Sequence, residues 1–275
     1  MEIGSPSWNT SDIKKAFDEF VEIYGDKPVT DNQGGMKAPH AFASYFMLKR
    51  MQPKVIIESG VWKGQGTWLF EKACPDAQII CLDIDFTNLI YRSSNAEYIE
   101  KDFSYLSVDT FDTDQTICFF DDHQSAFMRL QQMKWKGLKR AIFEDNYPIS
   151  QGDCYSLKKI FSNAGFFPEK RKDFRGKTKE LISKYFQTKS PQIVSENSTH
   201  SMELRNSLDL YYEFPPLFKE RFTRWGDEWT EPAYPTKPPI FDTSFNHKLR
   251  QESVHYNWIC YVELKGKLAE GRKSD

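Results

Sequence analysis

VIIESGVWKGQGT, residues 55–67, is the stretch that decides the fold. It begins as a short apolar run that ends in Glu58, and such a run predicts a strand buried on both faces. Gly60 permits a positive φ in the turn that follows, and Gly64 and Gly66 let a ligand approach the backbone closely. A helix is expected to begin here, and its free amide groups would favour a carboxylate or a phosphate. The stretch therefore predicts a cofactor loop between a strand and a helix.

Four more short apolar runs lie downstream and end in or near a carboxylate. They cover residues 78–83, 96–102, 116–122 and 140–145, with segments between them that are long enough for crossover helices. Alternating strands and helices predict a doubly wound, mostly parallel, Rossmann-like α/β sheet. Ligands bind beyond the carboxyl ends of the strands in such sheets. Five acids are expected at that edge: Glu58, Asp83, Asp102, Asp122 and Asp145.

The chain is expected to form a single domain built from four segments. These are an N-terminal helical cap over residues 1–50, the Rossmann-like core over 51–165, an insertion or lid over 166–252 that forms the acceptor site, and a final strand and tail over 253–275. In the cap, helical spacing predicts one helix that starts from Thr10 or Ser11 and a second after Pro39. We expect the insertion to lie outside the sheet and a late strand over 256–264 to join it antiparallel.

Composition excludes several classes of protein. The formal net charge of −2 gives no electrostatic basis for binding nucleic acid or an anionic membrane. No apolar run is long enough to span a membrane, and residues 1–10 lack the apolar region of a secretion signal. The five cysteines are scattered, so we expect buried reduced thiols rather than disulfides or a zinc site. We therefore expect a soluble, cytoplasmic protein without nucleic-acid or membrane partners, and homo-oligomerisation stays open.

The glycine spacing of the cofactor loop distinguishes between cofactors. It is G-x-x-x-G-x-G, with an acid two positions before the first glycine, whereas a dinucleotide site has G-x-G-x-x-G. The segment resembles motif I of class I S-adenosylmethionine-dependent methyltransferases, and the resemblance covers residues 50–165. It implies that Glu58 holds the methionine end, that Asp83 (or Asp85) binds the ribose hydroxyls and that Asp102 lies near the adenine. On this basis we expect Gly60→Val to abolish cofactor binding with the fold largely intact.

A second group of candidate residues follows the fourth and fifth predicted strands. Asp121, Asp122 and His123 follow one strand, and Glu144, Asp145 and Asn146 follow the other. Carboxylate and amide oxygens are ligands that suit Mg²⁺. The pattern resembles metal-dependent O-methyltransferases. Catechol O-methyltransferases carry Asp-His and Asp-Asn pairs, as in residues 122–123 and 145–146 here. The macrocin O-methyltransferase and cephalosporin hydroxylase families carry two successive acids, as in residues 144–145.

This second resemblance implies metal ligation by Asp122 and Asp145, with Glu144 or Asn146 as the third ligand. Asp122 and His123 are the expected catalytic residues, and His123 or Asp121 would accept the proton of a hydroxyl group. Two other interpretations stay open. His123 only supports Asp122, or the acids form a rim that binds no metal.

Together these patterns predict an S-adenosylmethionine-dependent O-methyltransferase, assisted by Mg²⁺, that methylates a hydroxyl of a sugar, a glycan or a small natural product. The alternatives are a metal-independent methyltransferase with another acceptor and a non-catalytic cofactor-binding protein of the same fold. A nicotinamide oxidoreductase is disfavoured by the glycine spacing.

Three further features each have two interpretations. Residues 34–36, with His40, either cover the cofactor or form an ordinary turn and helix start. The basic stretch over 170–179 either meets an anionic acceptor or is a solvated face. The aromatic patch over 211–229 either contributes to an acceptor site or packs the insertion.

Overall fold

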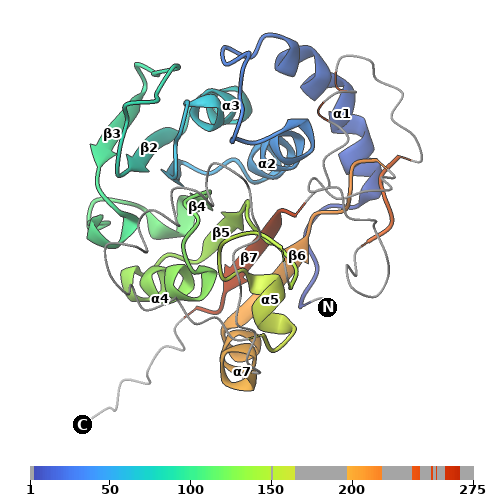
Figure 1. The fold of residues 1–275 in the computed structure, drawn as a ribbon, viewed down its shortest axis with the longest axis vertical. Helices are drawn as coiled ribbons and strands as arrows, with labels where there is room; N and C mark the ends of the chain where they lie inside the picture. The colour runs from blue at the N-terminus through green and yellow to red at the C-terminus, as the bar shows by residue number, and fades with distance from the viewer. Residues whose placement is uncertain are drawn as a thin grey trace, which may run out of the picture.

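The fold is a seven-stranded sheet between two layers of helices (Figure 1). The computed structural model describes residues 3–149, 151–164, 197–218, 237–241, 249, 252 and 258–266. The strands are β1 (Val55–Ser59), β2 (Gln78–Asp83), β3 (Ala96–Glu100), β4 (Thr116–Phe120), β5 (Arg140–Phe143), β6 (Leu208–Glu213) and β7 (Cys260–Leu264). The helices are α1 (Thr10–Gly25), α2 (Ala38–Met51), α3 (Gln65–Ala73), α4 (Ala126–Lys136), α5 (Leu157–Phe161) and α7 (Ser198–Ser207), with 3₁₀ turns at Phe103–Tyr105 and Thr113–Gln115.

The strand order is β3-β2-β1-β4-β5-β7-β6. Strands β1 to β5 pair in parallel, and β7 pairs antiparallel with both β5 and β6. The predicted doubly wound, mostly parallel Rossmann-like sheet is therefore confirmed, and so is the late antiparallel strand. The order reverses between β1 and β4, so the carboxyl ends of these two strands frame the position where such sheets bind ligands.

The expectation that residues 166–252 lie outside the sheet is wrong, because β6 falls within this range and forms an edge of the sheet. Leu210 and Tyr212 pack into the core on one face of the sheet, and Leu208 and Tyr211 pack on the other. Aromatic residues that suggested an acceptor patch are thus core residues of a strand that is covered on both sides. Ile3 also forms a bridge to Tyr211.

Alternation along the strands places the two hydrophobic cores. Ile56 and Ile79 point toward α1, α2 and α3, while Ile57 and Ile80 point toward α4, α5 and α7. Figure 1 shows these two groups of helices on opposite sides of the sheet. Because both faces are covered, the central strands are continuous apolar runs, as parallel strands usually are.

The first helix begins at Thr10, and its N-cap is Asn9 rather than Thr10 or Ser11. The side chain of Asn9 accepts hydrogen bonds from the amides of Ser11 and Asp12, and the Asp12 carboxylate accepts one from the Asn9 amide. This reciprocal pair is a capping box, which satisfies amides that have no partner within the helix.

Two predictions fall wholly or partly outside the part of the chain that the structure describes. They concern the basic stretch over 170–179 and the part of the aromatic patch that includes the tryptophans at 225 and 229. All five cysteines are described, and each is buried and unpaired, as expected. Among the described residues, no helix is long and apolar enough to cross a membrane.

Candidate cofactor and metal site

The loop between β1 and α3 is packed tightly against the rest of the sheet edge. Gly60 has a φ of 90° and Gly64 a φ of 85°, both in the left-handed region. A Cβ at Gly60 would collide with the carbonyl oxygen of Asp121, and one at Gly64 with the carbonyl oxygen of Tyr91. At both positions the left-handed φ and the neighbouring carbonyl oxygen exclude a side chain, whether or not a ligand is bound. Gly60→Val would disturb the ends of β1 and β4, contrary to the expectation that it leaves the fold largely intact.

Glu58 is buried at the end of β1 and faces the same loop. One carboxylate oxygen accepts hydrogen bonds from Thr67 Oγ1 at 2.5 Å and Cys81 Sγ at 3.4 Å. The other oxygen lies so close to Gly66 that a Cβ there would collide with it. Burial raises the pKa of Glu58 to about 8. Gly66 thus makes room for a carboxyl group that has little access to solvent.

Asp83, at the end of β2, forms hydrogen bonds with the backbone of the cofactor loop. Its Oδ2 accepts hydrogen bonds from the amides of Val61 at 2.8 Å and Trp62 at 3.1 Å. The alternative ribose ligand, Asp85, is exposed, and its carboxylate accepts hydrogen bonds from the amide and hydroxyl of Thr87. The structure therefore places Asp83, and not Asp85, in direct contact with the loop.

The segment over residues 31–36 lies across this loop. Trp62 Nε1 donates to the carbonyl of Gln33 at 3.2 Å, and Lys63 Nζ donates to the carbonyl of Asp31 at 2.6 Å. A pocket lies between the segment and the loop, and its lining includes Asn32, Gly35, Met36, Glu58, Gly60 and Asp121. The N-terminal segment is thus positioned to cover a ligand that is bound at the loop.

Asp102 and Asp122 both pair with one buried arginine. Arg129 Nη2 lies 2.5 Å from Asp102 Oδ2, and Arg129 Nε donates to Asp122 Oδ2 at 2.9 Å. Ser59 Oγ also donates to this Asp122 oxygen, at 2.6 Å. The hydrogen bonds from Arg129 hold the pKa of Asp102 well below its ordinary value. Asp102 lies at the carboxyl edge as predicted, but its carboxylate contacts protein, and an interaction with adenine stays a prediction.

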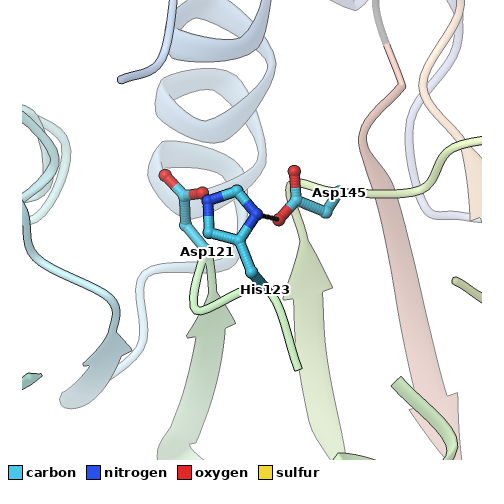
Figure 2. Close-up of side chains that lie close together, drawn as sticks. All are labelled: Asp121, His123 and Asp145. Atoms are coloured by element: carbon cyan, nitrogen blue, oxygen red, sulfur yellow. Dashed lines mark ion pairs between the residues drawn. The ribbon is translucent and has the colours of Figure 1, made fainter. Parts of the chain in front are cut away.

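Asp121 joins His123 and Asp145 beside this network, where the sequence pointed to Asp122. One ligand atom from each of the three residues lies within 4.8 Å of the others. Figure 2 shows the imidazole ring of His123 between the two carboxyl groups. His123 Nδ1 lies 3.2 Å from Asp145 Oδ2 and 3.1 Å from Asp153 Oδ1. Asp122 lines a small pocket together with His123 and Asp145, but its Oδ2 accepts a hydrogen bond from Arg129.

The carboxylate of Asp145 has the surroundings of a cation ligand. Asp145 is 8% exposed; His123 Nδ1 lies 3.2 Å from its Oδ2, and within the described part of the chain neither oxygen has a partner with hydrogen-bond geometry. Burial raises its pKa to about 7, although His123 opposes this shift. Burial and the carboxylates of Glu144 and Asp145 also raise the pKa of Asp121. Asp145 and Asp153 in turn raise the pKa of His123 to about 11. Several carboxylates that gather around one imidazole fit a divalent cation, so the residues present suit the predicted metal.

Glu144 is held by a histidine from the N-terminal cap. Its Oε1 pairs with His40 Nδ1, and His40 Nε2 accepts a hydrogen bond from the Trp258 amide at 2.8 Å. Because Nε2 accepts a hydrogen bond, the ring proton is on Nδ1, and Nδ1 donates a hydrogen bond to the Glu144 carboxylate. His40 therefore contacts a predicted metal ligand, and it does not line the pocket below the cofactor loop.

Asn146 is committed to structural hydrogen bonds. Its Nδ2 donates to the Tyr211 hydroxyl at 3.0 Å, and its Oδ1 accepts from the Lys158 amide at 2.9 Å. These contacts join the end of β5 to β6 and α5. Neither Glu144 nor Asn146 belongs to the cluster of Asp121, His123 and Asp145, and the choice between them as a third ligand stays a prediction.

Sequence reasoning overlooked Arg129 and Asp153, and it did not connect His40 with Glu144. Arg129 lies seven residues after Asp122, near the start of the helix that follows the fourth strand. A contact between Arg129 and Asp122 could therefore have been predicted from the sequence. No local pattern connects His40 with Glu144, which are 104 positions apart.

No protein-family model matches the chain, and a search of curated proteins gives no match. Similar solved structures include CmcI with Mg and SAM, at 23% identity and a TM-score of 0.32 over 40% of this chain and 53% of that one. The SAH-bound methyltransferase PaMTH1 from Podospora anserina matches at 16% identity and a TM-score of 0.36, over 52% and 74%. TomG, an O-methyltransferase from Streptomyces achromogenes involved in tomaymycin synthesis, in complex with SAM, matches at 9% identity and a TM-score of 0.40, over 94% and 97%.

The chain spans about half the length of the CmcI structures that it matches. At these identities and TM-scores the similarities carry no argument about this chain. The sheet itself, in the order β3-β2-β1-β4-β5-β7-β6 with β7 antiparallel, is Rossmann-like and mostly parallel.

Proposed function

We propose that this chain is an S-adenosylmethionine-dependent O-methyltransferase. It would use a divalent metal ion to methylate a hydroxyl of a sugar, a glycan or a small natural product. The observation that carries the proposal is the position of Asp121. This residue lines the pocket at the cofactor loop and also belongs to the cluster with His123 and Asp145. A cofactor in the pocket and an acceptor at the cluster would therefore meet at Asp121.

The pocket suits the cofactor that the loop motif implies. Glu58 and Gly60 line it at the end of β1, where the resemblance places the methionine end. Asp83 lies at the end of the neighbouring strand β2, where the resemblance places the ribose. The segment over 31–36 would exclude water from the bound cofactor.

The cluster provides the groups that the reaction needs at the acceptor. Asp145, with Asp121 or His123 and with Glu144 as a further candidate, would hold the metal, which would lower the pKa of an acceptor hydroxyl and orient it. The hydroxyl would give its proton to whichever of His123 and Asp121 does not bind the metal. Its oxygen would bond to the methyl carbon as the carbon–sulfur bond breaks, and S-adenosylhomocysteine would leave. Close placement of the two reactants supplies much of the rate increase.

Calorimetry of the full chain tests the cofactor assignment. S-adenosylmethionine should bind, and the nicotinamide dinucleotides should not. Tight binding of a nicotinamide dinucleotide, with none of S-adenosylmethionine, would overturn the proposal.

Asp145→Asn tests the role of the metal. It should reduce methyl transfer to a panel of hydroxylated acceptors by roughly 100-fold or more, the loss typical of removing one electrostatic contact to the reacting group. The affinity for S-adenosylmethionine should stay unchanged, because Asp145 does not line the cofactor pocket. A chelator should stop the reaction and a divalent ion should restore it. The matched control is Asp114→Asn, which removes an exposed carboxylate remote from the site. Activity that survives full chelation would replace this proposal with a metal-independent methyltransferase.

A further inference from the structure

We propose that His123 is itself a metal ligand, and that the site selects a first-row transition ion such as Mn²⁺ or Co²⁺ over Mg²⁺. This inference rests on the metal site of the proposed function, and it changes the identity of the ion. The acid pattern in the sequence predicts Mg²⁺ with oxygen ligands only. The structure instead brings an imidazole nitrogen into the cluster.

The geometry of the cluster supports His123 as a ligand. Its ring lies between the carboxyl groups of Asp121 and Asp145, from strands β4 and β5 (Figure 2). Ligand atoms within 4.8 Å of one another can share one ion with small side-chain adjustments. Ligation through Nδ1 would replace the contacts of this nitrogen with Asp145 and Asp153.

The negative charge around the imidazole ring of His123 favours binding of a cation. Four carboxyl groups surround the site: Asp121, Glu144, Asp145 and Asp153. Asp145 is the most informative, because it is 8% exposed and its Oδ2 lies 3.2 Å from His123 Nδ1, the contact that a shared metal ion would replace. Buried carboxylates are normally paired, hydrogen-bonded or coordinated to a metal.

The backbone conformation of His123 also supports its role as a ligand. Its φ is 54°, in the left-handed region that few residues other than glycine adopt, although histidine does so more often than most. Such a conformation costs free energy, and it is found most often where function requires a side chain in one place. Here it turns the ring toward the cluster.

The donor set decides the ion. Mg²⁺ strongly prefers oxygen ligands and gives up its water reluctantly. Carboxylates suit Mg²⁺, Ca²⁺ and Mn²⁺ alike, whereas imidazole suits iron, nickel, copper and zinc, so it is the imidazole nitrogen that shifts the preference of this set toward first-row transition ions.

The experiment measures metal binding to the full chain directly. In calorimetry, Mn²⁺ and Co²⁺ should bind at least about tenfold more tightly than Mg²⁺, which corresponds to about 1.4 kcal/mol. Pulsed electron paramagnetic resonance of the Mn²⁺-loaded protein should show coupling to a ligand nitrogen. In His123→Asn, the nitrogen coupling should disappear, and the preference for Mn²⁺ and Co²⁺ over Mg²⁺ should fall toward one. Asparagine keeps an oxygen donor and tolerates the left-handed backbone, so this variant is expected to fold.

His200→Asn is the matched control, because His200 stacks on Phe127 and is not part of the cluster. It should change neither the nitrogen coupling nor the preference between ions. Equal or tighter binding of Mg²⁺, absence of nitrogen coupling in the parent chain, or no binding of any of the three ions would overturn the inference. Binding of S-adenosylmethionine is measured separately, so failure of the inference is distinguishable from failure of the proposed function.

Discussion

Gly60 shows how one residue couples the cofactor loop to the sheet. Gly60→Ala should destabilise the fold by more than the roughly 1–2 kcal/mol of a left-handed backbone, because the new Cβ also collides with the Asp121 carbonyl. Urea denaturation measures the loss. Gly137→Ala is the matched control, since Gly137 has a φ of 75° but nothing near the new Cβ. Equal losses in the two variants would show that the loop does not pack on Asp121.

Glu58 makes the stability of the protein depend on pH. Its pKa is raised from 4.5 to about 8, so between these values the folded state holds more protons than the unfolded state. Its contribution to stability is present at low pH and is lost as pH rises toward 8. Glu58→Gln should flatten the fall in unfolding free energy across this window, measured by denaturation of the ligand-free chain. Glu100→Gln, on the exposed side of β3, is the control and should leave the slope unchanged. An unaltered slope in Glu58→Gln would contradict the prediction.

At the scale of elements, Arg129 of α4 joins the ends of two strands. It pairs with Asp102 after β3 and with Asp122 after β4, and it is 3% exposed. Arg129→Met keeps the apolar stem but leaves Asp122 and Asp102 unpaired, so we expect a loss of about 3 kcal/mol of unfolding free energy. Thermal and urea denaturation measure it. Lys139→Met breaks only an exposed ion pair with Asp114 and should have little effect. Similar losses in both variants would argue against the buried pairing.

At the scale of the whole molecule, His40 connects three distant parts of the chain. It lies on α2, pairs with Glu144 after β5 and accepts the Trp258 amide just before β7. His40→Ala leaves both partners without this contact, so we expect a loss of about 2 kcal/mol of unfolding free energy. Metal affinity should also fall roughly tenfold or more, because Glu144 loses the group that orients it. Denaturation and calorimetry with Mn²⁺ measure the two effects, with His200→Ala as the control. Unchanged metal affinity would show that Glu144 acts independently of the ion.

The sequence by itself determined the Rossmann-like core. The runs that end in Glu58, Asp83 and Asp145 became parallel strands β1, β2 and β5 of one sheet, with their carboxyl ends at the same edge, and the glycine spacing predicted the loop between β1 and α3. These features depend on side-chain alternation and turn chemistry within about 20 residues, so they are encoded locally. Because such patterns report only on nearby residues, they did not reveal that residues 208–213 form a buried strand, and this segment was assigned to an insertion. Its pairing with β7 joins segments some 50 positions apart.

Only the tertiary structure decided which acids form the cluster with His123. Asp121 and Asp122 are adjacent and chemically identical, and the carboxylate of Asp122 is already engaged by Arg129 and Ser59, whereas Asp121 joins His123 and Asp145. Asn146 likewise donates a hydrogen bond from its side-chain amide to the Tyr211 hydroxyl. Each outcome depends on a partner that is brought close by the fold, and hydrogen bonds act over about 3 Å regardless of separation along the chain. Sequence patterns therefore locate the edge of the sheet where the site lies, and long-range packing selects the side chains that enter it.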